Sequence, residues 1–456
     1  MKSGFSEETI VAPATAVGEG GIGIIRLSGT SAELTLQRFF RPSRSVDVFE
    51  SHQLYHGHLL DSSGSLLDEV LAVVMRAPRS YTGEEIVEVH CHGGPVIIRQ
   101  IVDLFIDAGL RLARPGEFTL RAFLNGRLDL SRAEAVIDLI RSRSESASQL
   151  AVRQLDGALS RIIYDLRERL VENLSLIEAH IDFPDEDISP PALANLCANV
   201  KKARDEIDPL LASFDSGRVL REGLNVLILG RPNVGKSSLL NALLGESRAI
   251  VTDIPGTTRD TVEESFVISG LPIRLIDTAG VHATSDPIEA EGVRRATEKV
   301  KTADLVLLVV DGSQEASPDD FFAFDLVEKD RALLVVNKSD CPAVLDRSRF
   351  SGLAATPVSA KNGAGLDLLK DKIASLFSAG GEVSESTMIS DRRHREALLR
   401  SREALNRFLA SVQSAQEPEF LALDLREALH ALGEITGETT PDEILDQIFS
   451  RFCIGK

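Results

Sequence analysis

One eight-residue segment constrains the fold of this 456-residue chain more than any other feature. It reads Gly230-Arg231-Pro232-Asn233-Val234-Gly235-Lys236-Ser237, a full G-x-x-x-x-G-K-S pattern between the strand-like run 225–229 and the helical run 238–244. A glycine-rich loop in that position predicts a phosphate site, because backbone amides at a helix N-terminus attract anions. Lys236 is expected to reach the β- and γ-phosphates of a nucleotide, and the Ser237 hydroxyl is expected on Mg²⁺.

A second motif follows a later strand of the same region. From residue 224 to about 377, predicted strands alternate with predicted helices, which is typical of a parallel sheet with crossover helices. The strand-like run 273–276 ends in Asp277-Thr278-Ala279-Gly280. There the Asp277 carboxylate can hold the Mg²⁺ shell, and the amide of Gly280 can sense a γ-phosphate.

Two further motifs indicate which base the nucleotide carries. Asn337-Lys338-Ser339-Asp340 follows the run 333–336, and Ser359-Ala360-Lys361 follows 356–358. Asp340 can accept hydrogen bonds from both N1-H and N2-H₂ of guanine, which adenine does not supply, and such a site can reject the wrong analogue by about 10⁴-fold. The second motif suits backbone contact with the base. Four motifs in this order predict a GTPase module that resembles the Ras-like class.

The loop between the first two motifs occupies the place of the first switch loop in Ras-like proteins. It reads Thr252-Asp253-Ile254-Pro255-Gly256-Thr257-Thr258-Arg259-Asp260, and Thr258 matches their Mg²⁺-binding threonine. One position departs from that class. Where Ras-like proteins carry a water-orienting glutamine, this chain has Val281, so another group must orient the water and a positive charge must be supplied.

Charge and cysteine content exclude other classes of protein. The net charge is −19, and acidic residues outnumber basic ones in each quarter of the chain, so bulk attraction cannot hold a nucleic acid or an anionic membrane. The four cysteines form no C-x-x-C pair, which argues against a zinc ribbon or disulfide framework. Nothing approaches the ~18 consecutive apolar residues of a membrane span. We therefore expect a soluble, cytoplasmic protein.

The order of strand-like and helical patterns along the chain predicts an inserted domain. Residues 1–118 mix strand-like runs, glycine-rich turns and one helix near 96–108, and predict an α+β domain. Residues 119–221 and 379–456 predict two parts of one all-α domain, with the α/β module, 222–378, set between them. The alternative is four consecutive domains. Within the helical parts, Ser131 with Glu134 and Thr440 with Glu443 predict capping boxes.

Beyond the nucleotide motifs, the chain resembles the MnmE (TrmE) family of tRNA-modifying GTPases over nearly its whole length. The resemblance is carried by Gly18 to Ser28, Tyr81-Thr82-Gly83-Glu84, His92-Gly93-Gly94-Pro95, Arg114-Pro115-Gly116-Glu117-Phe118, Ala179-His180-Ile181-Asp182-Phe183-Pro184 and Phe452-Cys453-Ile454-Gly455-Lys456. It implies a folate-binding-like α+β domain that dimerises, an all-α domain, and the inserted Ras-like P-loop domain.

The resemblance also implies how hydrolysis is catalysed. In this family the GTPase domains dimerise across their nucleotide faces around a potassium ion that supplies the missing positive charge. Asn233 would bind K⁺ with its side chain, and Thr252, Ile254 and Thr257 would complete the site. Glu289 corresponds to the catalytic glutamate that orients water, although its position alone is more typical of a solvated acid at a helix start. The residues implied to bind GTP are Asn233, Val234, Gly235, Lys236, Ser237, Ser238, Thr252, Asp253, Ile254, Pro255, Gly256, Thr257, Thr258, Asp277, Thr278, Ala279, Gly280, Asn337, Lys338, Asp340, Ser359, Ala360 and Lys361.

The N-terminal domain is implied to bind 5-formyl-tetrahydrofolate. The corresponding positions are Arg26, Glu88, Arg127 and Lys456, with an arginine at 127 where the family carries lysine. Without the resemblance, Arg26 and Glu88 are more typical of strand residues at an edge or in solvent. Cys453 is a candidate functional thiol; its other interpretation is a small buried hydrophobic residue.

The implied reaction builds an aminomethyl or carboxymethylaminomethyl group on carbon 5 of the wobble uridine, position 34, of certain tRNAs. The chain would act as a homodimer with MnmG (GidA), which carries FAD and uses NADH. Two alternatives remain. A ribosome-assembly GTPase should carry a basic RNA-binding domain, which is not evident here, and a folate enzyme with a degenerate GTPase domain is disfavoured because every nucleotide motif is intact.

Overall fold

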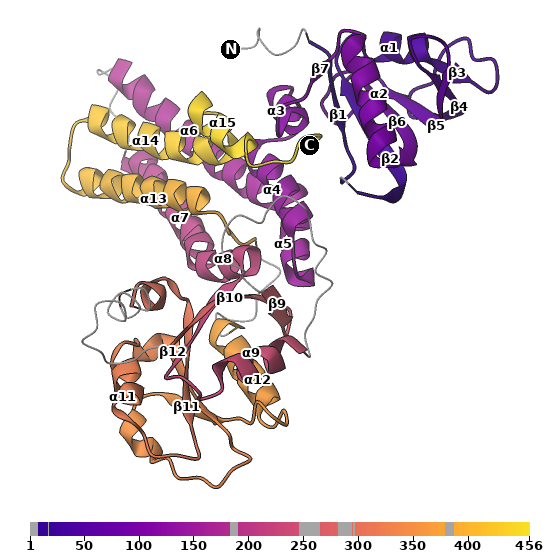
Figure 1. The fold of residues 1–456 in the computed structure, drawn as a ribbon. Coiled ribbons are helices and arrows are strands. Elements are labelled where there is room, and N and C mark those ends of the chain that lie inside the picture. Colours follow the sequence, from indigo (N-terminus) through magenta and orange to yellow (C-terminus); the bar gives the residue numbers. More distant parts are fainter. Residues whose placement is uncertain are drawn as a thin grey trace. The chain divides into compact units, whose positions relative to one another are not determined.

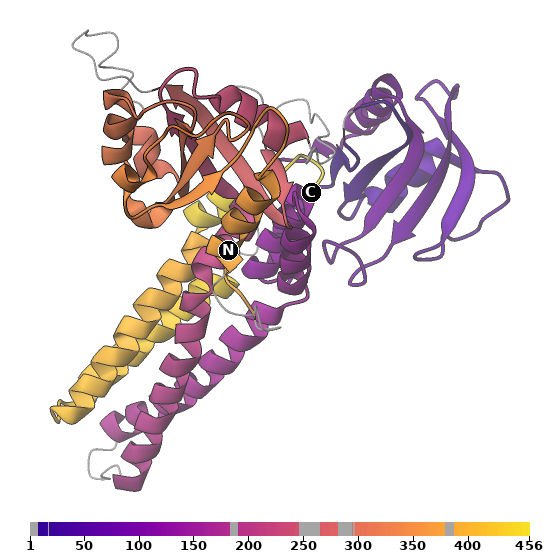
Figure 2. The same cartoon turned by 90° about the horizontal axis from the view of Figure 1, so that it is seen from below.

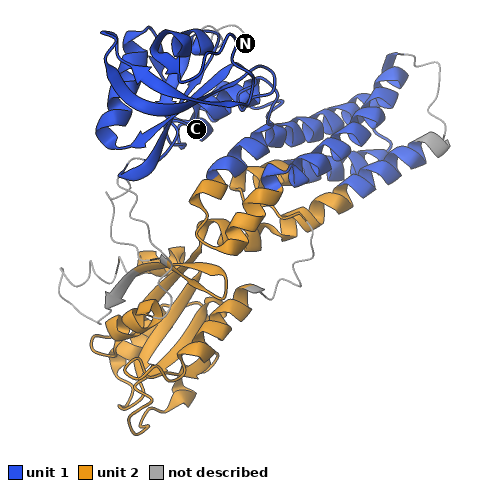
Figure 3. Ribbon diagram, turned by 90° about the vertical axis from the view of Figure 1, so that its right-hand side faces the viewer, with its two compact units in different colours: residues 1–137, 154–203, 400–456 blue, residues 138–153, 204–399 orange. Residues whose placement is uncertain are grey.

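A computed structural model describes residues 8–16, 18–182, 190–245, 265–280, 294, 297–378 and 387–456. The chain forms two compact units (Figure 3). Unit 1 comprises residues 1–137, 154–203 and 400–456, and unit 2 comprises residues 138–153 and 204–399. Each is described below by itself. Among the described residues, no helix is both long and apolar enough to cross a membrane.

Unit 1 contains a seven-stranded sheet with the strand order β3-β4-β5-β6-β2-β1-β7. The strands are β1 (Ile10–Pro13), β2 (Gly20–Ser28), β3 (Phe40–Pro42), β4 (Leu54–Leu60), β5 (Leu66–Met75), β6 (Ile86–Gly93) and β7 (Arg111–Leu112). The pairing of β1 with β7 is parallel, and the other pairings are antiparallel. The strand-like runs of the sequence thus form strands, and the predicted α+β class is confirmed for this part.

Two helices cover one face of that sheet, as Figure 1 shows. They are α1 (Ala32–Phe39) and α2 (Pro95–Asp107), and the rings of Phe39 and Phe105 lie 6.3 Å apart. Alternate strand residues, such as Val87 and Val89, point into the same core as these rings. Their neighbours along β6, Glu88 and His90, lie on the opposite face of the sheet, because side chains alternate along a strand.

The remainder of unit 1 is helical, and its helices come from distant parts of the chain. They include α3 (Glu117–Leu124), α6 (Ala158–Asp182), α14 (Pro418–Thr436) and α15 (Asp442–Phe449), with parts of α4 (Leu130–Arg141), α5 (Glu145–Leu155), α7 (Pro190–Ala212) and α13 (Arg392–Gln413). Helices α6 and α14 lie side by side (Figures 1 and 2). Arg426 of α14 pairs with Glu178 of α6 at 2.7 Å. Helices before and after the α/β module therefore pack together.

The chain end folds back onto the first strand. Leu445 and Phe449 of α15 share a core with Leu130 of α4. Gly455 has φ +97° and lies so close to the Pro13 carbonyl that no larger residue would fit without a shift. This packing seats Lys456 beside the sheet.

Unit 2 contains a six-stranded sheet with the strand order β13-β12-β11-β8-β10-β9. The strands are β8 (Leu224–Gly230), β9 (Ser265–Ile268), β10 (Leu271–Gly280), β11 (Leu305–Asp311), β12 (Ala332–Asn337) and β13 (Ala354–Pro357). All pairings are parallel except that of β9 with β10. The predicted parallel sheet is confirmed, and the four nucleotide motifs follow or end strands β8, β10, β12 and β13.

Both faces of this sheet are buried. Along β8, Val226 and Ile228 point into one core, whereas Leu227 and Leu229 point into the other. Helices α9 (Lys236–Gly245) and α12 (Leu366–Ser378) cover the first face, and α11 (Pro318–Asp325) covers the second (Figure 1). Near-continuous apolar strands are what a parallel sheet covered on both faces requires.

An arginine ties together three separate segments of unit 2. Arg221, in α8 (Phe214–Glu222), donates from Nε to Asp138 at 2.8 Å and from Nη1 to Asp391 at 2.6 Å. Charge pairing with both carboxylates outweighs the effect of burial and raises the pKa of Arg221 above its ordinary value. The α/β module thereby stays attached to the helical segments that enter and leave it.

Both predicted capping boxes are wrong. Helix α4 begins at Leu130, and Asp129 accepts from the Arg132 amide at 3.0 Å and from the Ser131 hydroxyl at 2.7 Å. Asp129 thus takes the capping role predicted for Ser131. At α15, Pro441 precedes the helix, and the Thr440 hydroxyl instead donates to the Glu434 carbonyl at 3.0 Å.

Candidate functional site

The nucleotide motifs lie at one edge of the unit 2 sheet. Because β8, β10, β11, β12 and β13 are parallel, their carboxyl ends share that edge. Backbone pairing sets Gly280 of the second motif opposite Gly230 of the first. Nothing further is described for the side chains of residues 277–280. Separate sequence motifs thus converge on a single site.

The loop after β8 has the geometry of a phosphate cradle. Asn233 and Gly235 have φ values of +62° and +97°, a left-handed conformation that turns successive amides toward one side. Asn233, Ser237 and Ser238 are exposed, so their side chains are accessible to a ligand. The Lys236 ammonium donates to the carbonyls of Gly230 at 2.8 Å and Arg231 at 2.9 Å, and burial lowers its pKa.

The side chain of Arg231 also attaches the phosphate loop to the rest of the module. The Arg231 guanidinium donates from Nε to the Asp320 carboxylate of α11 at 3.1 Å and from Nη2 to Gln314 at 2.9 Å. Asp320 is 2% exposed and also accepts from the Ser317 amide and hydroxyl, forming the capping box of α11. The side chain of the second loop residue thus points away from the cradle into the module.

Asn337 joins the phosphate loop to the two base motifs. Its side-chain amide donates to the Val234 carbonyl at 2.8 Å, and its side-chain oxygen accepts from the Ala360 amide at 3.1 Å. Asn337 is 2% exposed and packs directly over Gly235, where a side chain would clash with it. The Asn337 side chain therefore connects the three loops directly.

Asp340 is exposed and oriented for recognition. The Ser359 hydroxyl donates to Oδ1 of Asp340 at 2.7 Å, and this hydrogen bond is the largest of several effects that lower the Asp340 pKa. The Ser359 hydroxyl thus fixes the orientation of the exposed carboxylate. Such a group can accept two hydrogen bonds from neighbouring N-H groups, as the guanine edge requires.

Some of the expected site residues lie outside the described part of the chain. They are Thr252, Asp253, Ile254, Pro255, Gly256, Thr257 and Thr258 of the expected switch loop, together with Val281 and Glu289.

Two of the residues expected to bind folate form an ion pair in unit 1. Arg26 and Glu88 are cross-strand neighbours on β2 and β6, and their side chains meet at 2.8 Å on the sheet face opposite α1 and α2. The guanidinium lies over the ring of Tyr81, 5.4 Å from its centre. Burial and the positive charge of Arg26 lower the pKa of Lys456, while Glu88 and Cys453 act in the opposite direction. Arg26, Glu88 and Lys456 thus share one electrostatic environment.

The other two candidates from that domain differ in their surroundings. Arg127 is exposed and donates to the Ser80 carbonyl at 3.1 Å, with its stem against Gly83. Cys453 is exposed, so its interpretation as a buried hydrophobic residue is wrong. Its backbone carbonyl accepts from the Gly116 amide at 3.4 Å, which fixes the chain at this point.

Sequence reasoning missed a buried charge network in the same domain. Arg121 is 2% exposed and donates to Glu84 at 3.0 Å and to Glu117 at 3.1 Å, and Glu117 also pairs with Arg111. The network connects Tyr81-Thr82-Gly83-Glu84 with Arg114-Pro115-Gly116-Glu117-Phe118, the two motifs that carried part of the family resemblance. The two motifs were noticed in the sequence, but the ion pairs that their acidic residues, Glu84 and Glu117, form with buried arginine were not predicted.

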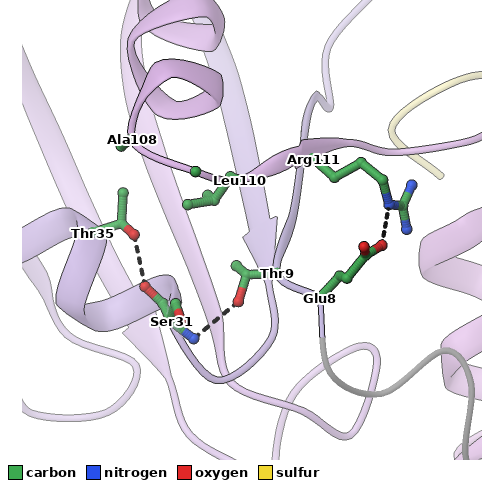
Figure 4. A pocket seen from close by; sticks show the side chains of 8 residues that line it. Glu8, Thr9, Ser31, Thr35, Ala108, Leu110 and Arg111 are labelled. Atoms are coloured by element: carbon green, nitrogen blue, oxygen red, sulfur yellow. Dashed lines mark hydrogen bonds and ion pairs between the residues drawn. The ribbon is translucent and has the colours of Figure 1, made fainter.

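A polar pocket of about 270 Å³ lies near that network (Figure 4). Its lining includes Thr9, Ser31 and Arg111. Thr9 accepts from the Ser31 amide at 2.9 Å, and Arg111 pairs with Glu8 at 2.6 Å. Because these polar groups are already paired with each other, the pocket gives no indication of a ligand.

Comparison with known proteins identifies the family. Residues 9–127 match the model of the GTP-binding protein TrmE N-terminus, and residues 130–453 match that of the MnmE helical domain. The tRNA modification GTPase MnmE of Syntrophotalea carbinolica is 54% identical over 99% of this chain and 100% of its own length, and that of Geobacter sulfurreducens is 50% identical over the same shares. Among solved structures, the G domain of the T. maritima FeoB iron transporter is 30% identical over 34% of this chain and 98% of its own, with a TM-score of 0.26. The chain belongs to the MnmE family of tRNA modification GTPases.

Proposed function

We propose that this protein is a K⁺-stimulated GTPase that acts with MnmG on the wobble uridine of certain tRNAs. Together they would install an aminomethyl or carboxymethylaminomethyl group at C5 of position 34, with GTP hydrolysis and dimerisation of the GTPase domains driving the modification. The observation that carries the proposal is the convergence of the phosphate loop and both base motifs through Asn337, in a chain that matches the family over its full length.

The nucleotide would bind along the carboxyl edge of the unit 2 sheet. Lys236 would exchange the carbonyls of Gly230 and Arg231 for phosphate oxygens, a change that is favourable because burial penalises the charged ammonium and a phosphate supplies the opposite charge. Asp340 would read the guanine edge, with Ala360 and Lys361 beside it. The geometry of the described residues fits this role, because the Asp340 carboxylate is exposed and already oriented by Ser359.

Two cations would accompany GTP. Ser237 and Thr258 would hold Mg²⁺, which neutralises phosphate charge, and Ser237 suits that role because it is an exposed, hydroxyl-bearing residue at the start of α9. Asn233 would hold K⁺ with Thr252, Ile254 and Thr257. Asn233 fits because it is an exposed residue on a left-handed turn of the phosphate loop and carries a side-chain amide oxygen. Glu289 would orient the attacking water.

Unit 1 would bind 5-formyl-tetrahydrofolate, which supplies a one-carbon unit. Arg26, Glu88 and Lys456 suit a ligand that carries both hydrogen-bonding and acidic groups, because donors and an acceptor share one environment. Arg127 keeps the positive charge expected at its position, and Cys453 offers an exposed thiol next to Lys456. The proposed assembly is a homodimer in complex with MnmG, the subunit that would carry FAD and use NADH.

Mass analysis of tRNA nucleosides tests this proposal. Undermodified tRNA is incubated with this protein, MnmG, GTP, 5-formyl-tetrahydrofolate and a nitrogen donor, with FAD and NADH present. We expect a modified uridine whose mass includes the new C5 substituent. Its formation should require both proteins and GTP, and a non-hydrolysable GTP analogue should not support it. An unchanged uridine with both active proteins present would refute the proposed reaction.

A further inference from the structure

Asp311 is a buried carboxylate at the nucleotide edge that belongs to none of the four nucleotide motifs. It ends β11, between the phosphate loop strand β8 and the base-motif strand β12. Its side chain is 2% exposed, yet it is ionised in an ion pair with Lys338, whose ammonium lies 2.6 Å from Oδ2. A buried charge is costly unless it is paired, so this contact requires an explanation.

Local turn chemistry accounts for only one of the two carboxylate oxygens. Asp311 Oδ1 accepts from the Ser313 amide at 3.0 Å and from its hydroxyl at 2.7 Å, within an Asp-x-Ser turn. Asp346 makes the same two contacts with Ser348, at 3.0 and 2.7 Å, on an exposed surface. The turn therefore forms without burial or a lysine. The second oxygen of Asp311, directed at Lys338, is the feature that sets it apart.

Lys338 occupies a conformation that a lysine disfavours. Its φ is +62°, where the side chain of an L-residue crowds its own backbone. The residue lies between Asn337, which is fixed to the phosphate loop, and the turn that presents Asp340. The ion pair holds the Lys338 side chain on the β11 side of this turn, and with it the backbone geometry that carries Asp340.

We propose that Asp311 is a positioning residue for guanine recognition, which acts by holding Lys338 in its left-handed conformation so that Asp340 meets the base edge in register. The inference rests on the proposed nucleotide site. It adds a residue from a strand end that carries none of the four nucleotide motifs. Since Asp340 needs two simultaneous hydrogen bonds, a small rotation of the turn costs more for guanine than for hypoxanthine, which offers only one of them.

The decisive experiment is a mutant cycle on nucleotide affinity in the full-length protein. Asp311→Asn keeps the shape but replaces the acceptor facing Lys338 with an amide that can be a donor. We expect its Kd for a fluorescent GDP to rise about tenfold, the scale expected when one hydrogen bond to a charged group is lost. The preference for GDP over inosine diphosphate should fall with it. Asp346→Asn, at the matched exposed turn, should change neither quantity.

The second half of the cycle places Asp311→Asn in a Lys338→Met background. In that background, Asp311→Asn should raise the Kd for GDP by less than a further twofold, because the Lys338 ammonium that pairs with Asp311 is already absent. Equal effects of Asp311→Asn in both backgrounds, or an unaltered GDP/IDP preference in the single variant, would overturn the proposal. If Asp311→Asn fails to fold, Asp311→Glu, which keeps the charge but lengthens the side chain, takes its place with the same expected loss of base preference. A wild-type protein that does not prefer GDP to ADP would instead refute the nucleotide site itself.

Discussion

The side-chain amide of Asn337 lies 2.8 Å from the carbonyl oxygen of Val234, so the residue that ends β12 is hydrogen-bonded to the phosphate loop. The same side chain accepts from Ala360. Asn337 thus belongs to the framework of the site. Its role is to hold the phosphate loop, the Asn337-Lys338-Ser339-Asp340 loop and the Ser359-Ala360-Lys361 loop in one arrangement.

Asn337→Ala should weaken GTP binding by at least about 30-fold, because the Val234 carbonyl and the Ala360 amide lose their partner at about 1–3 kcal/mol each. Fluorescent GTP titration measures this. Asn362→Ala provides the control, since the Asn362 oxygen also accepts a backbone amide, that of Ala364 at 3.0 Å, but in an exposed turn. If both variants bind GTP like the wild type, Asn337 does not hold the site together.

Whether a structural feature can be predicted from the sequence depends on how far apart in the sequence the interacting residues lie. The four nucleotide motifs lie at or after the ends of strands, as predicted, because each comes with an apolar run, and a parallel sheet brings strand ends to one edge. The two predicted capping boxes were wrong for a different reason, although they involve only residues that are close together in the sequence. Asp129 and Ser131 are both capping residue types two positions apart, and the choice between them depends on packing: Ser131 is 1% exposed beside Ser160.

Pairs between distant residues could not be predicted. Arg221 meets Asp391 across 170 residues, and the Arg26–Glu88 pair depends on the register of β2 against β6. A single sequence contains no signal for such a register. Lys338 and Asp311 are 27 residues apart in the sequence. In the sequence, the segment Asp311-Gly312-Ser313 indicates only an ordinary Asp-x-Ser turn.

Arg221→Met should destabilise unit 2 by about 3 kcal/mol, because the Asp138 and Asp391 carboxylates, 14% and 18% exposed, would both lose the guanidinium that pairs with them. Urea unfolding followed by fluorescence of a bound nucleotide analogue reports on this unit. Arg331→Met supplies the control within the same unit: its pair with Glu328 is well exposed, so its loss should cost less than about 1 kcal/mol. Equal losses in the two variants would remove Arg221 as the attachment point.

Glu117 should make unit 1 sensitive to acid. Burial alone would raise its pKa, but hydrogen bonds from Arg111 and the Arg114 amide outweigh that effect and place the pKa below the ordinary 4.5. The stabilisation is therefore fully present above pH 4.5 and is lost as the pH falls through the lower, folded-state pKa. We expect the stability difference between wild type and Glu117→Gln, from urea titrations between pH 6 and 3, to shrink only below pH 4.5. A difference that is constant over this range would contradict the assignment.

Hydrolysis should be fast in KCl and slow in NaCl at equal ionic strength, since the proposed cation at Asn233 replaces an arginine finger worth about 10³–10⁵ in rate. Asn233→Gly sharpens the test. Glycine accepts the φ of +62° that Asn233 adopts, so the loop and its affinity for GTP should survive while the side-chain ligand is lost. Phosphate release should then become slow in both salts. Potassium stimulation that persists in this variant would exclude Asn233 as a ligand.

Glu289→Ala should retain GTP binding while the turnover number falls by about 10² or more, because the proposed role is to orient water in the transition state rather than to bind the nucleotide. Stopped-flow binding of fluorescent GTP and single-turnover phosphate release separate the two steps. Glu298→Ala is the matched control, an exposed glutamate paired on the surface with Arg294 at 2.9 Å. A turnover number in Glu289→Ala equal to that of the control would leave Val281 unexplained, and another group would have to orient the water.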